Sequence, residues 1–109
     1  MDKAKEQLYR LEAEIIKAAA HPIRLAVIDC LREGERCVCV IAERVGAERS
    51  NVSRHLAVMT RAGLLSSRKD GLMVYYSLRT PCILRFLSCV DECLKEQLRE
   101  SAVVLRSLR

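Results

Sequence analysis

The sequence predicts a mainly α-helical domain with a small β-hairpin wing, a winged helix-turn-helix in the order α-α-α-α-β-β-α. Three observations lead to this fold class. Apolar residues recur at helical spacing through residues 3–62 and again through residues 81–107. The link at residues 46–49 has the length of the turn in a helix-turn-helix. Two short apolar runs then flank an Asp70-Gly71 pair, which is a strong hairpin signal.

A proline separates the first two helices. Residues 3–20 place Leu8, Leu11 and Ile15 at helical spacing with charges between them. Pro22 suits the first turn of the next helix. That second helix is expected over residues 22–33, with Gly34 ending it.

The third and fourth helices are expected to form the helix-turn-helix proper. The third is short and closes at Gly46, and the fourth covers about residues 50–62. Ser50 suits its N-cap, and Gly63 suits the first position beyond its end. The apolar positions of the two helices are Val38, Ile41, Val45, Val52, Leu56 and Met59.

The hairpin and the last helix complete the order of elements. Strands are expected over residues 64–68 and 72–78, joined by a tight turn at 69–71. Pro81 then opens one long helix that ends near residue 107 and spans ~40 Å, more than the width of such a domain. Its apolar residues form two adjoining stripes, Ile83, Leu87, Val90, Leu94 and Leu98, and Cys82, Phe86, Cys89 and Cys93. One stripe can cover its own domain and the other requires a second surface. We therefore expect a homodimer through the first and last helices, which presents two recognition helices to successive major grooves.

Length and composition predict one domain over residues 1–109. Half of the residues are apolar, which argues against disorder. The N-terminus lacks the apolar run of a signal peptide, and no stretch approaches the ~18 apolar residues of a membrane span. The expected location is therefore cytoplasmic, with no membrane partner. In a reducing compartment the six cysteines are expected to be metal ligands or redox groups rather than structural disulfides.

The net charge is concentrated in one segment. The chain carries 19 Lys and Arg against 14 Asp and Glu, a formal charge of +5. Residues 49–69 hold five of the basic side chains and none of the acids, so the rest of the chain is formally neutral. This segment covers the fourth helix and the first strand of the hairpin. A basic surface confined to such elements predicts binding to double-stranded DNA.

Individual DNA contacts follow from positions on the fourth helix and the wing. Asn51 and Arg54 are the candidates for base edges, because Asn can pair with adenine and Arg with guanine. Side chains expected to contact phosphate are Ser50, Ser53, His55 and Arg61. At the tip of the wing, Arg68 and Lys69 are expected to reach the adjacent DNA backbone or the minor groove. For Ser53 and His55 the alternative is local helix packing.

Cys37 and Cys39 are the strongest indication of an ion-binding site in the sequence. Within a regular helix they would point ~200° apart, but at a helix start with Cys37 extended their sulfurs can converge. The N-terminal end of a helix also favours the thiolate, which is the ligand form. The alternative is that both are small buried apolar residues.

The last helix carries a second set of thiols. Cys82, Cys89 and Cys93 lie within a ~40° arc, and Cys89 and Cys93 can chelate one ion as a pair. Core packing is again the alternative, and it is the expected role of Cys30. Without a His, Asp or Glu cluster, a sulfur-only shell selects a soft ion: Zn(II), Cd(II), Pb(II), Cu(I) or the metalloid As(III).

Several separated stretches resemble the ArsR/SmtB family of dimeric winged-helix repressors. They are A-A-A-H-P-I-R-L-A-V-I at 18–28, C-V-C at 37–39, V-S-R-H-L-A-V-M-T-R-A-G-L-L at 52–65 and R-K-D-G-L-M-V-Y-Y-S-L at 68–78. Arg36 and Val40 replace the Leu and Asp that usually flank C-V-C in the arsenic and cadmium sensors, and Glu48-Arg49 replaces a Ser-Gln or Thr-Gln pair. His21 matches a family position that is not a ligand.

The resemblance implies a repressor that releases operator DNA when a thiophilic ion, As(III) first, binds three thiolates. Cys37 and Cys39 supply two, and Cys89 or Cys93 supplies the third, from either chain, with Cys82 behind them. A separate site at Cys82, Cys89 and Cys93 is the competing arrangement.

Ion binding at the start of the third helix is expected to reorient the fourth helix packed against it. The rival hypothesis is a repressor that senses oxidants or reactive sulfur through a disulfide or polysulfide. No enzyme is expected, because a thiol oxidoreductase would need C-x-x-C after a strand. A structural zinc module would need four ligands. No organic cofactor is expected.

Overall fold

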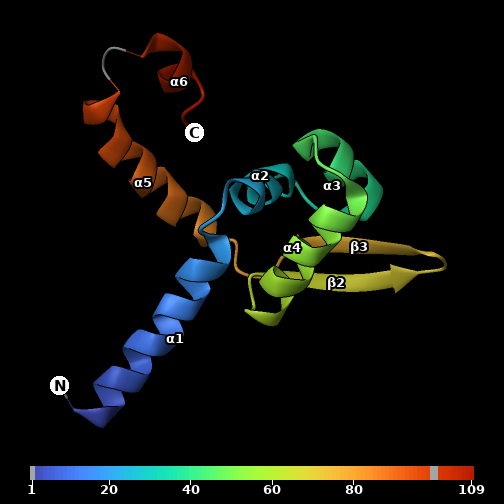
Figure 1. The fold of residues 1–109 in the computed structure, drawn as a ribbon, viewed down its shortest axis with the longest axis horizontal. Helices are drawn as coiled ribbons and strands as arrows, with labels where there is room; N and C mark the ends of the chain where they lie inside the picture. The colour runs from blue at the N-terminus through green and yellow to red at the C-terminus, as the bar shows by residue number, and fades with distance from the viewer. Residues whose placement is uncertain (1, 99–100) are drawn as a thin grey trace.

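The computed structural model describes residues 2–98 and 101–109, which form a helical domain with a small sheet (Figure 1). The elements are α1 (Lys3–Ala19), α2 (Pro22–Cys30), β1 (Arg36–Cys37), α3 (Val38–Val45), α4 (Arg49–Arg61), β2 (Leu65–Asp70), β3 (Met73–Leu78), α5 (Ile83–Gln97) and α6 (Ala102–Arg106). The winged helix-turn-helix predicted from the sequence is confirmed, with an added strand and a divided last helix.

Helices α2, α3 and α4 pack together as the core of the domain. The apolar face of α4 enters this core at Val52, Leu56 and Met59, whose side chains have no exposed surface. Ile28 from α2 and Ile41 from α3 are equally buried. Each such side chain contributes about 1.5–3 kcal/mol on burial. The orientation of α4 is thus fixed by the same side chains that stabilise the fold.

Local side-chain and glycine chemistry sets the helix boundaries. Asp2 caps α1 through its Oδ1, which accepts from the Lys5 N–H at 2.8 Å, and His21 caps α2. Gly63 has φ +89° beyond the end of α4, and the next N–H reaches back to the Met59 carbonyl. Gly63 therefore occupies the left-handed position expected of it. The expected N-cap of α4 at Ser50 is wrong, because the N-cap is Glu48 and the helix begins at Arg49.

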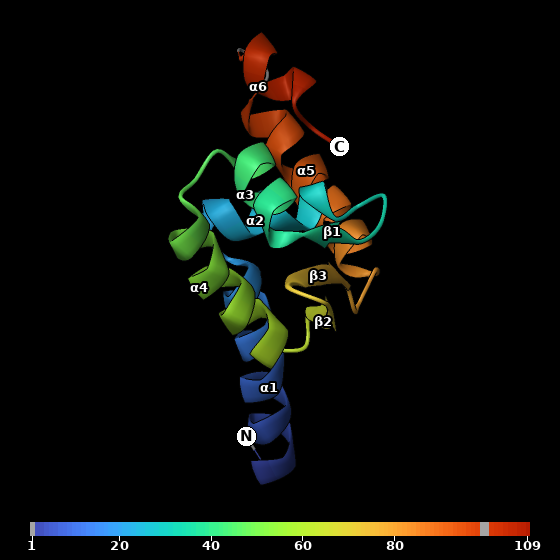
Figure 2. The same cartoon turned by 90° about the vertical axis from the view of Figure 1, so that its right-hand side faces the viewer.

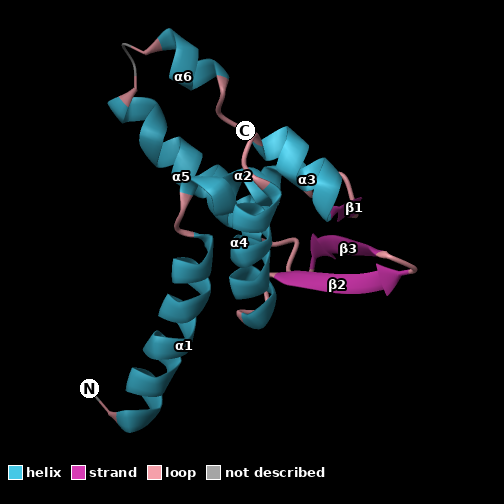
Figure 3. Ribbon diagram, turned by 45° about the vertical axis from the view of Figure 1, so that its right-hand side comes forward, coloured by secondary structure: helices cyan, strands magenta, loops and turns pink. Residues whose placement is uncertain are grey.

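The sheet has three antiparallel strands in the order β1-β3-β2 (Figure 3). Strand β1 was not expected. It pairs Arg36 with Tyr76 and Cys37 with Tyr75, so the start of α3 is attached to the wing. The β2–β3 register aligns Asp70 with Met73. The turn is therefore a two-residue loop at 71–72 instead of the expected three residues 69–71, with Gly71 at φ +62°.

The prediction of one continuous helix over residues 81–107 is wrong. Pro81 precedes α5, which ends at Gln97, and α6 folds back beside α5 (Figures 1 and 2). Residues 99–100 of the expected helix lie outside the described residues. The physical reason for the fold-back is a polar network at Arg109. It holds the end of the chain close to α5 and α2.

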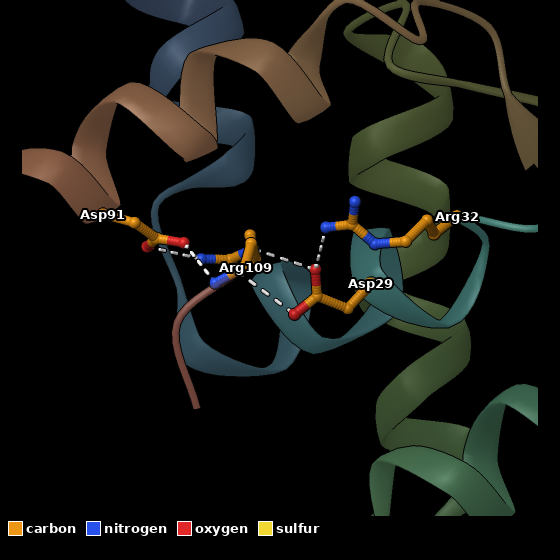
Figure 4. A network of polar contacts seen from close by, with 4 residues as sticks. All are labelled: Asp29, Arg32, Asp91 and Arg109. Carbon is orange, nitrogen blue, oxygen red and sulfur yellow. Dashed lines mark hydrogen bonds and ion pairs between the residues drawn. The ribbon is translucent and has the colours of Figure 1, made fainter. Parts of the chain in front are cut away.

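Arg109 joins two carboxylates that are far apart in the sequence (Figure 4). Its backbone N–H and guanidinium donate to Asp91 on α5 at 2.9 and 2.8 Å, and the guanidinium also donates to Asp29 on α2 at 3.0 and 3.2 Å. Asp91 is only 2% exposed. Burial opposes its ionisation, but the hydrogen bonds from Arg109 outweigh burial and lower the Asp91 pKa. The partner of this buried charge is thus Arg109, 18 residues further along the chain, and Arg32 completes the network at Asp29.

Helices α1 and α5 extend away from the core on the side opposite the wing (Figure 1). The Cα radius of gyration is 15.6 Å, above the ~13 Å of a compact domain of ~100 residues. An apolar groove of about 330 Å³ lies between the two helices, lined by Ile15, Ile16, Ile83 and Phe86 among others. Large apolar side chains left exposed on α1 and α5 are Leu8, Tyr9, Leu11, Ile15, Ile16, Phe86 and Val90. These helices therefore present much apolar surface that their own domain does not cover.

None of the helices in the described part of the chain combines the length and apolar character needed to cross a lipid bilayer.

Candidate nucleic-acid interface and thiol pair

The polar face of α4 lies opposite its buried stripe. Ser50, Ser53, Arg54 and Arg61 are exposed on this face, and Asn51 is half-buried. The Ser50 hydroxyl donates to Glu48 at 3.0 Å, and the Arg54 guanidinium donates to Asn51 Oδ1 at 3.3 Å. The two residues predicted to read bases are thus in contact with each other. This contact orients Arg54 along the helix before any DNA is present.

His55 lies between α4 and the start of α2. Its Nδ1 accepts a hydrogen bond from Arg24 Nε at 3.0 Å, and its ring centroid is 4.4 Å from that of His21. Because Nδ1 is an acceptor, the proton of the neutral ring is on Nε2. Burial first, and then the electrostatic influence of His21, Arg24 and Arg54, lower the His55 pKa. His55 therefore joins two helices, and its predicted phosphate contact would have to use Nε2–H.

The two basic residues of the wing have different surroundings. Lys69 is exposed on β2. The guanidinium of Arg68 donates to both carboxylate oxygens of Glu35, at 2.8 and 2.6 Å, and lies over the Tyr75 ring at 4.7 Å from its centroid. Glu35 and Arg24 contact the predicted DNA-binding residues, although the sequence does not indicate either of them. No short-range pattern marks either one, because their partners are 33 and 31 residues away.

The Cys37 and Cys39 sulfurs lie 2.6 Å apart at the junction of β1 and α3. Cys37 is the N-cap residue of α3, with φ −79° and ψ 160°. This extended conformation turns its side chain toward Cys39, as expected from the sequence. The hydrogen bond from the Cys39 thiol, supported by the Val40 N–H, lowers the Cys37 pKa, and the same contact raises the Cys39 pKa. Within the pair, this contact favours the thiolate of Cys37 over that of Cys39.

The other cysteines are distributed over two helices. Cys82, Cys89 and Cys93 are exposed on or beside α5, and Cys30 is partly buried at the end of α2, where burial raises its pKa. Cys30 packs against the core, in agreement with its expected role. Within residues 2–98 and 101–109, no three Cys, His, Asp or Glu side chains of one chain come together as a metal site. A third ligand from α5 therefore stays a prediction.

The thiol pair has two structural connections to the DNA-facing elements. Helix α3 packs against α4, and β1 pairs with β3 of the wing. The start of α3 is therefore in contact with both the recognition helix and the wing. This arrangement of an exposed basic helix, a wing and a helix-turn-helix core defines a winged-helix DNA-binding regulator.

Comparisons with known proteins specify the class further. Residues 21–67 match the family described as bacterial regulatory protein, arsR family. The chain is 38% identical over 105 residues to the uncharacterized HTH-type transcriptional regulator Rv0081 of Mycobacterium tuberculosis, covering 95% of this chain and 92% of the relative. It is 30% identical over 101 residues to the arsenical resistance operon repressor of Escherichia coli K12, covering 92% and 86%.

A solved structure agrees in fold. The homodimeric winged helix-turn-helix DNA-binding domain Mb0332 of Mycobacterium bovis matches with a TM-score of 0.78 and 28% identity, covering 94% of each chain. The chain therefore belongs to the ArsR family of bacterial regulatory proteins. It is a transcriptional regulator rather than an enzyme, as expected from the sequence.

The His55 contact predicts a pH dependence of stability. Its folded-state pKa is lowered from the ordinary value of about 6.5. The unfolded chain therefore binds more protons, and stability decreases as the pH falls from about 6.5 through the folded pKa. A protonated ring also cannot accept from Arg24. Thermal melting of wild type and His55→Gln at pH values from about 8 to 5 should show a smaller acid-induced decrease in Tm for the variant. Equal decreases would show that His55 does not link the two helices in this way.

Proposed function

We propose that this protein is a metal-responsive repressor that binds operator DNA as a homodimer and releases it when a thiophilic ion, As(III) first, binds its thiolates. The observation that supports this is the thiol pair at the start of α3, with its sulfurs 2.6 Å apart and the Cys37 pKa lowered. The relationship to an arsenical resistance operon repressor supports the choice of inducer. Cd(II), Pb(II) and Zn(II) are the alternative ions.

The donor set fits such an ion. Cys37 and Cys39 are soft ligands whose sulfurs already converge, and the hydrogen bond from Cys39 lowers the Cys37 pKa. When bound, the ion would link these sulfurs to a third thiolate. We assign the third to Cys89 or Cys93, from the same or the partner chain, with Cys82 next. These three are exposed, so they remain accessible to a second surface.

The route from the thiol pair to DNA follows the packing of α3. Ile41 on α3 and Val52 and Leu56 on α4 are fully buried in one core. A displacement of α3 therefore carries α4 with it and changes the geometry of the DNA-reading face. By linkage, DNA must weaken ion binding by the same factor that the ion weakens DNA binding.

Replacing Cys37 and Cys39 together by serine should leave DNA binding intact and abolish release. Couplings of this kind are ~1–3 kcal/mol, so wild type should lose about 5- to 150-fold in affinity with As(III). Fluorescence anisotropy with a labelled duplex selected by the protein from a random-sequence pool measures both quantities under reducing conditions. Cys30→Ala is the matched control, since it removes a thiol outside the pair.

Inducible release that persists in the double serine variant would contradict the proposal. Mass spectrometry of oxidant-treated protein tests the redox alternative, which requires a covalent sulfur link and no ion. Thiolate-to-metal absorption titrations of Cys82→Ser, Cys89→Ser and Cys93→Ser identify the third ligand.

The assembly that we propose is a homodimer through α1 and α5. The exposed apolar side chains of α1 and α5 support it, as does the homodimeric state of the related M. bovis domain. Replacing Ile15 by Glu would place a charge beside the apolar groove, so the variant should become monomeric in light scattering and bind DNA more weakly. Leu72→Glu, at the tip of the wing, is the control and should stay dimeric. A dimeric Ile15→Glu variant would exclude this surface.

For the DNA contacts we propose that Asn51 and Arg54 read bases and that Ser50, Ser53, His55, Arg61, Arg68 and Lys69 bind phosphates. Arg54→Ala should weaken binding to the selected duplex by ~1–3 kcal/mol and relax its sequence preference. Arg61→Ala should weaken all duplexes alike and reduce the salt slope by ~0.9. Arg106→Ala on α6 is the control. It removes the same charge far from α4 and should change neither the sequence preference nor the salt slope. Unaltered sequence preference in Arg54→Ala would remove it from the base contacts.

A further inference from the structure

The ion pair between Arg68 and Glu35 crosses from the wing to the segment just before the thiol pair. Arg68 is on β2, and both of its donating nitrogens face the Glu35 carboxylate. Asp70 is a weaker neighbour at 3.8 Å. The wing arginine that would otherwise face a phosphate is therefore already held by a carboxylate.

Strand pairing places this ion pair in register with the thiol site. Cys37 on β1 and Arg68 on β2 are both aligned with Tyr75 on the central strand β3. Residues directly opposite in antiparallel strands share a face of the sheet. Glu35 precedes Cys37 by two residues and therefore moves with the same strand. A displacement of β1 at the thiol pair changes the position of the Glu35 carboxylate relative to Arg68.

We propose that Glu35 is an intramolecular competitor of DNA for Arg68 and couples the thiol pair to the wing. In this arrangement Arg68 contacts phosphate only after leaving Glu35. A displacement of β1 toward Arg68 holds the guanidinium in the ion pair and removes one phosphate contact per protomer. This coupling rests on the proposed function, whereas the competition itself does not require an inducer.

The size of the effect follows from the exposure of the pair. Arg68 is 54% and Glu35 36% exposed, so solvent screens their attraction. Such pairs change an equilibrium by about two- to fivefold. When Arg68 binds a phosphate, it also steepens the salt dependence of DNA binding by ~0.9 in log K against log salt. The slope of log K against log salt therefore distinguishes the release of Arg68 from Glu35 from a general change in DNA affinity.

The experiment compares Glu35→Gln with Glu33→Gln in ligand-free protein. Glu33 is exposed in the same loop, so its replacement removes the same charge without touching the Arg68 pair. Anisotropy over a salt series, with the selected duplex and with an unrelated one of the same length, should show about two- to fivefold tighter binding and a steeper slope for Glu35→Gln alone. Adding Glu35→Gln to Arg68→Gln should have no effect, because there is no guanidinium to free.

Equal increases in affinity for Glu35→Gln and Glu33→Gln, or an increase that persists in the Arg68→Gln background, would overturn the competition. The coupling has its own readout, because Glu35→Gln should show a smaller As(III)-induced loss of affinity than wild type. An unchanged loss would overturn the route through the wing while leaving ion-induced release in place. Absence of release in wild type would instead contradict the proposed function and leave the competition standing.

Discussion

The burial of one face of α4 against α2 and α3 is the constraint on which the rest of the structure depends. Val52, Leu56 and Met59 are fully buried and together contribute about 5–9 kcal/mol. A coupling between two binding sites is only ~1–3 kcal/mol. An inducer therefore cannot separate α4 from this core. The recognition helix must move with its neighbours as one unit, and deformation must occur where packing is weaker.

The segment that meets this requirement is the short strand β1 and the start of α3. In strand β1, the two residues Arg36 and Cys37 pair with β3 of the wing. This pairing is short compared with the buried face of α4, and the segment adjoins both the sheet and the core, where Val38 is buried. An ion bound by two thiols at this position can therefore change the orientation of α2, α3 and α4 together, without disrupting the packing between these helices.

The sequence predicts those parts of the structure that depend on local patterns. The buried stripe of α4, the left-handed Gly63 and the convergence of Cys37 and Cys39 follow from helix period, glycine chemistry and backbone geometry at a helix start. Features set by long-range contacts could not be predicted in this way. The last helix contains no Gly or Pro where it ends, and its fold-back depends on Arg109 meeting Asp29, 80 residues earlier. Strand β1 could not be predicted from the sequence either, because two residues are too few to show a periodic pattern.

The same distinction applies to charge. A count along the sequence assigns the whole formal charge of +5 to residues 49–69, because no acid lies there. In the folded chain Glu35 approaches that segment from outside and compensates Arg68, while Arg54 and Arg61 remain exposed on α4. The positive surface is therefore stronger on the recognition helix than on the wing. Binding through α4 does not require an ion pair to break, whereas full engagement of the wing does. In this arrangement α4 provides a constant part of the affinity for DNA. The part provided by the wing depends on whether Arg68 leaves Glu35.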